Sequence, residues 1–349
     1  MRILHIEDEV WDSGISHYAL TLAGALKDKG HEVHFWGRQG SVPCVKAREL
    51  GLAVEEFSHP WLTLPRLRAR VKAVGVEVIN GHTGSSHSLA AAVSAGLGVP
   101  VVRTRGDARP PSGSPLSRAL AKRTSAFIAA NSLIKTQLEG AYPGSRVELV
   151  FQGLPAPPPS PISEDRNVGI VGRLDPVKGH ETLIAASGKV LAEFPSSRFL
   201  AAGSGTAERD VLLRALAAKA GLGGSFEFLG YVPSVDEFIS RCRVGVVAST
   251  GSEAVSRAAL EWMSHGRPVV ASRVGCLPDL VEDGVTGLLV PPGEPDALAD
   301  ALLQLFREPG RTLAMGAKAR ERFGSRFCVE RFVSETERIY RDLLHRLPS

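Results

Sequence analysis

The stretch Val168-Gly-Ile-Val-Gly172-Arg173-Leu-Asp-Pro-Val-Lys178-Gly-His180-Glu contains a strand, a loop and the start of a helix. The apolar run 168–171 predicts a buried strand, and helical spacing of apolar residues begins near His180. Glycines and charged residues between them predict the loop. A strand followed by a helix that returns the chain to the next strand is the unit of a parallel sheet.

The same alternation runs through the whole sequence. We expect helices at 15–26, 87–96, 180–193, 207–220, 256–265 and from 295 to the end. The expected strands are 2–6, 33–35, 76–79, 99–103, 127–130, 168–171, 198–202, 225–229, 244–248, 268–271 and 287–290. The fold class predicted is therefore α/β, with two doubly wound parallel-sheet domains.

The segment Pro155-Ala-Pro-Pro-Pro-Ser-Pro161 separates the two halves. Prolines at this density fit neither a helix interior nor a central strand, so the segment predicts an extended linker between domains. Open parallel sheets bind ligands at the carboxyl ends of their strands. Two such domains facing each other would form a central cleft that holds two substrates.

Composition sets the broad class. The 349 residues are 44% apolar and 22% charged, which is typical of a globular protein. The four cysteines show neither zinc-site nor disulfide-scaffold spacing, so we expect reduced thiols. The chain opens directly on a strand, and no apolar run approaches the roughly 20 residues of a membrane span. A cytoplasmic protein is expected.

Positive charge is concentrated in the first half. Residues 1–160 contain 18 Lys and Arg against 13 Asp and Glu, and they include the run Arg66, Arg68, Arg70 and Lys72. This run predicts either a solvated helix face or contact with an anionic surface, such as a phosphorylated acceptor or lipid head groups at the inner face of the cell membrane. No basic stripe is interleaved with aromatics, which argues against nucleic acid as a partner.

Two cations lie on the loop after strand 168–171. Arg173 and Lys178, together with the N–H groups of the following helix, would suit a doubly charged anion such as a diphosphate. The alternative is that both are ordinary surface charges.

Two carboxylates lie around the expected helix 256–265. Glu253 precedes this helix and Glu261 lies on it. Ionised carboxylates accept hydrogen bonds, which suits sugar hydroxyls. The N–H groups of Val255 and Ser256 could meet an oxyanion or a sugar oxygen. The alternative is an acidic helix start and an ordinary helix glutamate.

Glycines and polar loops follow other strands. Gly14, Gly203 and Gly205 allow close backbone approach to a ligand, but the GxGxxG dinucleotide fingerprint is missing. In the first half, the loops 80–87 and 103–109 contain histidine, arginine and aspartate, which could line the cleft or serve structural roles. The acidic cluster 7–9 has no matching partner, so no metal site and no cofactor are expected.

Taken in order, these motifs resemble the family 4 retaining glycosyltransferases. The resemblance covers essentially the whole second half and is looser in the first. It is carried by the following motifs: Gly172-Arg173 with Lys178, Gly203 with Gly205, Phe228-Leu-Gly230-Tyr-Val, Glu253-x7-Glu261, Gly266-x-Pro268-Val-Val-Ala, and Gly275-x-x-Pro278-Asp-x-Val-x-Asp-Gly-x-x-Gly287-x-Leu-Val-Pro-Pro-Gly293.

The resemblance implies a GT-B architecture with an acceptor-side domain 1–158, a nucleotide-sugar domain 159–325, and a final segment 326–349 that crosses back to the first domain. It implies a metal-independent enzyme that transfers a sugar from a nucleoside-diphosphate sugar to a hydroxyl of a glycan or glycolipid. The donor nucleotide would be UDP or GDP. A role in lipopolysaccharide or surface polysaccharide synthesis follows from the family's habits.

The resemblance also implies roles for individual residues. Arg173, Lys178 and Glu253 would be catalytic: the two cations would neutralise the donor diphosphate, and the carboxylate would hold donor-sugar hydroxyls. The acceptor or sugar side would contain His82, Arg105 and Asp107. The remaining donor-binding residues would be Gly14, Gly172, Gly203, Gly205, Gly230, Ala254, Val255, Ser256 and Glu261.

The sequence departs from the family's pattern at three places. Gly106 stands where the family often has a histidine, Ser13 replaces the first glycine of a common pair, and Gln152 replaces a frequent asparagine. Two other functions are consistent with an α/β chain. One is an NAD(P)-dependent oxidoreductase, which the missing fingerprint disfavours. The other is a non-catalytic sugar-nucleotide-binding protein, which the intact charged motifs disfavour.

Overall fold

The computed structural model describes residues 1–107, 109–251 and 253–346. The chain divides into two compact units. The first unit contains Met1–Leu154 and the C-terminal segment Cys328–Ser349, and the second contains Pro155–Phe327. The last three residues of the expected segment 326–349 lie outside the described part of the chain.

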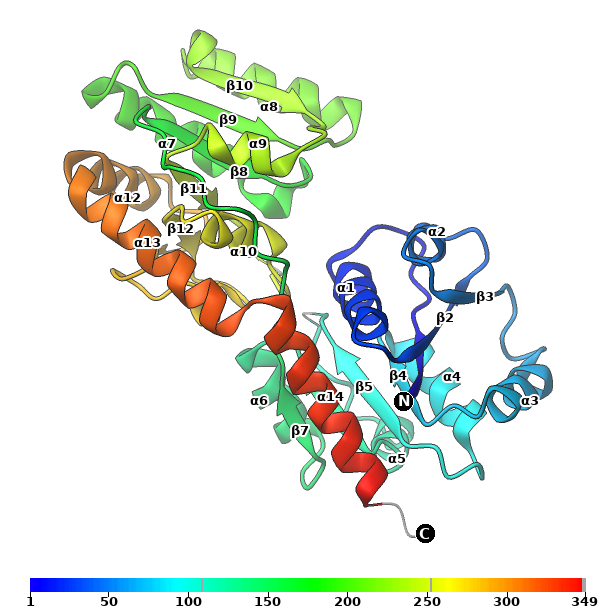
Figure 1. The fold of residues 1–349 in the computed structure, drawn as a ribbon. Helices are drawn as coiled ribbons and strands as arrows, with labels where there is room; N and C mark the ends of the chain where they lie inside the picture. The colour runs from blue at the N-terminus through cyan, green and yellow to red at the C-terminus, as the bar shows by residue number, and fades with distance from the viewer. Residues whose placement is uncertain (108, 252, 347–349) are drawn as a thin grey trace. The chain divides into compact units, whose positions relative to one another are not determined.

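The first unit is built on a seven-stranded parallel sheet with the order β3-β2-β1-β4-β5-β6-β7. Figure 1 shows helices flanking this sheet. The strands are β1 Arg2–Ile6, β2 Glu32–Arg38, β3 Ala53–Phe57, β4 Val78–Gly81, β5 Val101–Arg105, β6 Ala126–Ala129 and β7 Val147–Leu149. The helices are α1 Gly14–Asp28, α2 Val42–Glu49, α3 Leu64–Val74, α4 Gly84–Ser94, α5 Pro115–Ala121, α6 Ser132–Ala141 and α14 Val329–His345.

The second unit repeats the plan with six parallel strands in the order β10-β9-β8-β11-β12-β13. Its strands are β8 Asn167–Val171, β9 Arg198–Ala202, β10 Phe226–Gly230, β11 Val244–Val247, β12 Val269–Ser272 and β13 Gly287–Val290. Its helices are α7 His180–Glu193, α8 Ala207–Lys219, α9 Val235–Ser240, α10 Arg257–Ser264, α11 Leu277–Leu280, α12 Pro295–Arg307 and α13 Pro309–Arg326, with short 3₁₀ turns at Pro176–Lys178 and Gly223–Ser225.

Both sheets confirm the predicted doubly wound α/β class. In each unit the strand order reverses beside the first strand, between β1 and β4 and between β8 and β11. Central strands are apolar on both faces because helices cover both, as in β11, whose four residues are all buried. Loops that leave the carboxyl ends of the strands at such a reversal form the usual ligand site of this fold.

The final helix, α14, packs against the first unit. The Phe332 ring contacts Tyr18 edge-on, with the ring centroids 4.6 Å apart. The buried Tyr340 hydroxyl accepts a hydrogen bond of 2.7 Å from the Asn80 side chain on β4. Glu337 bonds Lys29 at 2.5 Å, and this contact, with Arg341, lowers the pKa of Glu337 to about 2. Buried aromatic and ionic contacts therefore fasten the end of the chain to α1 and β4.

The proline-rich segment is attached to the second unit. The fully buried Arg267 donates to the backbone oxygens of Ser160 and Pro161, at 3.2 and 2.7 Å. Arg320 donates to Pro157 O at 2.9 Å and to Ser264 O at 2.9 Å. Backbone carbonyls outside helices and sheets also need hydrogen-bond donors, and along this segment arginine side chains supply them.

Two strands were missed by the sequence analysis, β3 and β7. Both are edge strands. The β3 sequence, Ala-Val-Glu-Glu-Phe, carries two adjacent glutamates, and β7 has only three residues. Edge strands are solvated on one side and therefore lack the continuous apolar pattern that reveals a central strand.

No helix in the described ranges combines the length and apolar character required to cross a membrane.

Candidate active site

Glycines form the carboxyl edge of the second sheet. Gly172 and Gly203 directly follow β8 and β9, and Gly230 is the last residue of β10. Backbone hydrogen bonds link the strand ends, from Gly172 N to Ala202 O at 2.9 Å and from Gly203 N to Gly230 O at 2.8 Å. A Cβ at Gly203 would overlap the Gly172 carbonyl, and its φ of +141° also disfavours other residues. The structure therefore brings three of the expected donor-binding glycines to one bare backbone surface.

The loop after β8 is held against the loop after β11. A Cβ at Gly179 would overlap the Ala248 carbonyl, and Thr250 N donates to Val177 O at 2.9 Å. This close approach places Lys178 beside Glu253, and the Lys178 ammonium forms an ion pair with Glu253 Oε1. Since β8 and β11 are neighbours at the reversal of strand order, the pair lies where this fold binds ligands.

Glu253 is buried yet compensated. Its side chain is only 2% exposed, while that of Lys178 is 28% exposed. Besides the lysine, Glu253 Oε1 accepts a 2.6 Å hydrogen bond from the Ser249 hydroxyl. Its carbonyl accepts a 2.7 Å bond from Cys276 N, at a point where a Cβ on Gly275 would not fit. A charged, hydrogen-bonded carboxylate with one solvent-facing cation can contact both an anion and hydroxyl groups.

Arg173 occupies a different environment. Its side chain is 69% exposed and pairs with Asp175 at 2.7 Å. The structure does not place Arg173 in contact with Lys178, so the expected cation pair shares a loop without sharing a partner. An exposed ion pair of this kind contributes little to stability, which leaves the arginine available to an incoming anion.

The residues after Glu253 lead into α10. Ala254 and Ser256 are buried, Val255 is half-buried, and Ser256 is the N-cap position. Glu261 lies in the second turn and accepts a 2.6 Å bond from Arg257 Nε. Burial raises the pKa of Glu261, an effect that Arg257 opposes. Gly205, the fourth glycine expected in the second unit, lies close to the Leu174 side chain on the loop after β8.

Two buried residues of this region, His180 and Ser249, were missed. His180 begins α7 directly after Gly179 and is fully buried, and neither ring nitrogen has a hydrogen-bond partner in the part of the chain that the structure describes. Burial lowers its pKa to about 4, so the ring is neutral at physiological pH. Ser249 was missed as well, because a serine at the end of a strand has no distinctive spacing.

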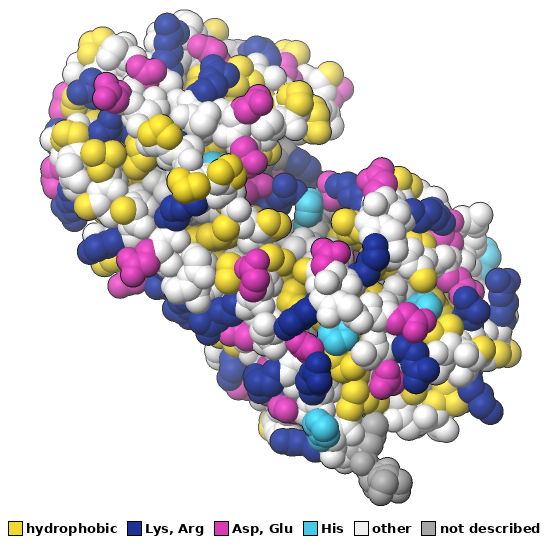
Figure 2. All heavy atoms as spheres, viewed as in Figure 1, with side chains coloured by type: hydrophobic (Ala, Val, Ile, Leu, Met, Phe, Trp, Pro, Cys, Tyr) yellow, Lys and Arg dark blue, Asp and Glu magenta, His cyan; other side chains and the backbone are white. Residues whose placement is uncertain are grey.

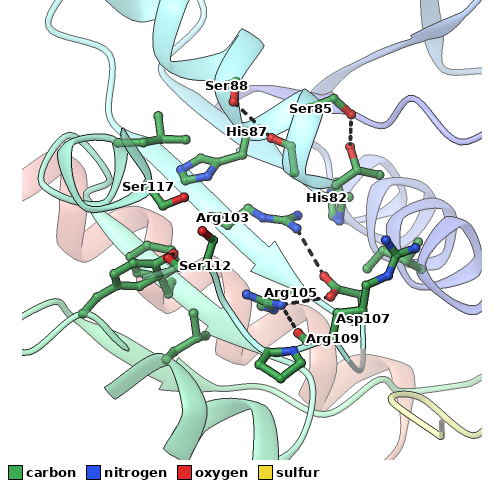
Figure 3. A pocket seen from close by; sticks show the side chains of 18 of the residues that line it. His82, Ser85, His87, Ser88, Arg103, Arg105, Asp107, Arg109, Ser112 and Ser117 are labelled. Carbon is green, nitrogen blue, oxygen red and sulfur yellow. Dashed lines mark hydrogen bonds and ion pairs between the residues drawn. The ribbon is translucent and has the colours of Figure 1, made fainter. Parts of the chain in front are cut away.

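In the first unit, polar residues surround a cavity of about 550 Å³ (Figure 3). His82, Arg105 and Asp107, the residues expected on the acceptor or sugar side, all line it. Gly14 is the first residue of α1, and it is not among the lining residues, although the next residue, Ile15, is. The other lining residues are Glu9, Thr83, Gly84, Ser85, His87, Ser88, Arg103, Arg109, Pro110, Ser112, Leu116, Ser117, Leu120, Phe127, Leu138 and Tyr142.

The histidines of this cavity are neutral. His82 is buried, and its Nε2 lies 2.9 Å from Nδ1 of His5, with the two rings stacked. Burial lowers the pKa of His82 well below its usual range and that of His5 to about 3. His87 bonds the Thr124 hydroxyl at 2.7 Å, and burial lowers its pKa to about 3. Near neutral pH these rings act as hydrogen-bonding groups without charge.

Within the described residues, no cluster of three or more His, Cys, Asp or Glu side chains could hold a metal ion.

The basic run on α3 has structural partners. Arg68 donates to the carbonyl oxygens of Ala92 and Ala95 at the end of α4, at 2.8 and 2.6 Å. Arg66 and Arg70 lie 3.8 and 3.5 Å from Glu55. Figure 2 shows basic side chains interspersed with acidic ones across the visible face. These contacts fit the solvated helix face, and contact with an anionic membrane stays a prediction.

Solved structures share this fold. A crystal structure of Anabaena HepE in complex with UDP matches with a TM-score of 0.88 and 21% identity, covering 98% of this chain and 100% of that chain. A glycosyltransferase from Rickettsia africae matches with a TM-score of 0.89 and 16% identity, covering 99% of each chain. The fold is therefore GT-B, the architecture of a large class of glycosyltransferases.

Sequence comparison gives the family. The model described as "Glycosyltransferase Family 4" matches residues 13–155, and that described as "Glycosyl transferases group 1" matches residues 165–308. A D-inositol 3-phosphate glycosyltransferase from Frankia alni is 32% identical, with 88% of this chain and 89% of the relative aligned. The counterpart from Corynebacterium urealyticum is 33% identical over an aligned region that covers 50% of this chain and 43% of that relative. The chain belongs to glycosyltransferase family 4.

Proposed function

We propose that this glycosyltransferase moves a sugar from a nucleoside-diphosphate sugar to an acceptor hydroxyl with retention of anomeric configuration. The observation that carries the proposal is the Lys178–Glu253 ion pair at the glycine edge of the second unit. The pair combines a cation for a diphosphate with a carboxylate for sugar hydroxyls, and it lies beside backbone that a ligand can approach closely.

The donor diphosphate would lie against Lys178 and the first turn of α7. Lys178 has three N–H donors, of which the ion pair with Glu253 uses one, so the others can meet phosphate oxygens. Arg173 would exchange Asp175 for the diphosphate. In the transition state, negative charge grows on the leaving phosphate, so these cations would stabilise it more than the ground state. This supports transfer without a metal ion.

Glu253 would orient the donor sugar. Its Oε1 is held by Lys178 and Ser249, and the second oxygen, together with N–H groups at the start of α10, would receive sugar hydroxyls and oxygens. Glu261 would accept the ribose hydroxyls of the nucleotide. The backbone near Gly230 would contact the base.

The chemical step needs no protein nucleophile. The bond between the anomeric carbon and the diphosphate oxygen breaks, and the acceptor oxygen bonds to that carbon on the same face. The acceptor proton passes to the departing diphosphate. The charge formed on the phosphate is therefore partly neutralised by the proton it receives and partly by Lys178 and Arg173.

UDP is the first donor nucleotide to test, because several structures that share the fold were solved with UDP or UDP-glucose. For the acceptor we propose a hydroxyl of a glycan or glycolipid precursor of a surface polysaccharide or lipopolysaccharide. The relatives named D-inositol 3-phosphate glycosyltransferases favour a second acceptor class, a phosphorylated cyclitol.

The test is transfer from a panel of UDP- and GDP-sugars to glycan, glycolipid and cyclitol phosphate acceptors, with and without EDTA. NMR of the product would give the anomeric configuration. Retained configuration and activity in EDTA are expected. Inverted product would refute the retaining mechanism, and nucleotide binding without turnover on any acceptor would favour a non-catalytic binding protein.

A further inference from the structure

The first-unit cavity carries an excess of positive charge. The charged side chains along its described lining are Arg103, Arg105 and Arg109 against Asp107 and Glu9, and both lining histidines are neutral. Three guanidinium groups therefore face two carboxylates. An uncompensated cation inside a cavity is costly unless an anion arrives to pair with it.

The two deeper arginines are held in place by the fold. Arg103 on β5 is buried and donates to Gly81 O at 3.2 Å and Thr104 O at 2.6 Å. Burial lowers its pKa to about 10, which leaves it charged at neutral pH. Arg105, at the end of the same strand, donates to Asp107 at 3.0 Å and to Arg109 O. Their positions are fixed before any ligand binds.

Hydrogen-bonding capacity remains unused at this cluster. The Arg105 Nε–H is buried and has no acceptor within the described residues. Asp107 lies 3.6 Å from Arg103 and is 43% exposed, so it satisfies that guanidinium weakly. Figure 3 shows both arginines turned toward Asp107, beside the serines of the same cavity. The N-terminal end of α4, at Gly84 and Ser85, adds N–H groups without intrahelical partners.

The remaining wall suits a ring. Phe127 and Tyr142 stack with centroids 5.4 Å apart, and both line the cavity. The volume of about 550 Å³ lies within the ordinary range of small-molecule sites, which is about 300–1,000 Å³. Serine hydroxyls around it can exchange hydrogen bonds with sugar or cyclitol hydroxyls.

We infer that this cavity binds the acceptor through an anionic substituent, a phosphate or a carboxylate on a sugar-like ring, with Arg105 as its principal contact and Arg103 and Arg109 in support. The inference rests on the proposed function, because it takes the first-unit cavity as the acceptor site. In this arrangement Asp107 competes with the substituent for the arginines, so it sets how tightly the anion is held.

The test is calorimetric titration with sulfate, which carries no proton to donate at neutral pH. Saturating UDP is present so that the expected donor phosphate site is filled. Arg105→Gln should weaken sulfate binding about tenfold, since a hydrogen bond to a charged group is lost. Asp107→Asn should tighten it about threefold, because a competing carboxylate is removed. Arg66→Gln, an exposed arginine outside the cavity, should leave it unchanged.

Opposite signs for the two cavity variants distinguish anion binding from a structural role. Equal weakening by Arg105→Gln and Asp107→Asn, or no change with Arg105→Gln, would overturn the inference. If wild-type protein binds neither UDP nor GDP, the proposed function fails instead, and sulfate titration without nucleotide still decides the anion site.

Displacement of bound sulfate identifies the source of the substituent. Glucose 6-phosphate and vesicles containing phosphatidylinositol are compared with glucose and with phosphatidylcholine vesicles. Displacement by the sugar phosphate assigns a soluble acceptor, and displacement by the anionic vesicles assigns a lipid-linked one. Displacement by neither, or by glucose as effectively as by its phosphate, would contradict the inference.

Discussion

Each unit buries a glutamate beyond a central strand of its sheet, and the two glutamates are compensated differently. Glu253, after β11, pairs with Lys178 and accepts a hydrogen bond from Ser249. Glu7, after β1, is fully buried, and among the described residues its carboxylate has only the Glu9 N–H and the Ser16 hydroxyl as partners, at 2.9 and 3.3 Å. Burial, aided by the charges of Glu9 and Asp8, raises the pKa of Glu7 to about 8.

The difference separates an ionised site from a neutral one. In the second unit, charge is retained next to a bare glycine edge, which suits a charged donor. In the first unit, Glu7 and the histidines around His82 are neutral at physiological pH, and the charge lies on arginines further along the edge. Two sheets of the same topology therefore present different chemistry at their carboxyl ends.

The largest expected effect comes from filling the close approach that positions Lys178. Gly179→Ala places a methyl group against the Ala248 carbonyl at a φ of +72°. We expect a loss of about 3 kcal/mol or more in the free energy of unfolding, together with loss of nucleotide binding. Urea denaturation measures the free energy of unfolding.

The control is Gly188→Ala, in α7 with open space around it, which should stabilise the protein by up to about 1 kcal/mol. Equal changes in the free energy of unfolding for the two variants would show that the contact between Gly179 and Ala248 is unimportant.

Glu7→Gln should alter the pH dependence of stability. The folded pKa of Glu7, about 8, lies above its unfolded value, so the protonated carboxyl stabilises the native state at low pH and this contribution is lost as pH rises through 8. The variant should match wild type below pH 4.5 and exceed it by up to about 5 kcal/mol above pH 8.

Denaturation at pH 4, 7 and 9 measures this pH dependence. The exposed Glu49→Gln is the control and should show no such trend. A constant difference between Glu7→Gln and wild type across the pH range would mean that folding does not raise the pKa of Glu7, and it would contradict this prediction.

Ser249→Ala removes the hydroxyl that holds Glu253 beside Lys178. A hydrogen bond to a charged group contributes about 1.5–3 kcal/mol, so kcat/KM for the donor should fall about 10- to 100-fold. Steady-state kinetics measure the change in kcat/KM, and Ser240→Ala, at an exposed serine on α9, is the control. Unchanged kinetics would show that Glu253 needs only its lysine.

The smallest effect distinguishes the arginines of α3. Arg68→Ala should lower the free energy of unfolding by about 1 kcal/mol, because it removes two hydrogen bonds to the end of α4. Arg66→Ala should change it by less than about 0.5 kcal/mol, because its ion pair with Glu55 is exposed.

Sedimentation of the same two variants with anionic vesicles tests whether α3 contacts a membrane surface. A large loss of vesicle binding in Arg66→Ala would favour the membrane surface.

The central elements of the fold could be predicted from sequence, since buried parallel strands are continuous apolar runs. The edge strands β3 and β7 could not, because their residues are partly solvated. In the candidate site, the glycines were visible because positive φ and close approach restrict residue choice. Lys178 and Glu253 were visible through their charge on loops that follow strands and through the family resemblance. Ser249, His180 and the partners of Arg103 were invisible, because tertiary packing alone gives them their neighbours.

The most direct test of the central claim is donor kcat/KM for Lys178→Ala measured beside Lys189→Ala. Lys189 is a solvated lysine on α7, paired with Asp300. Loss of a charge-stabilising contact to the leaving phosphate should lower kcat/KM by about 100-fold or more in Lys178→Ala and leave the Lys189 variant at the wild-type value. Wild-type kcat/KM in Lys178→Ala would contradict the account.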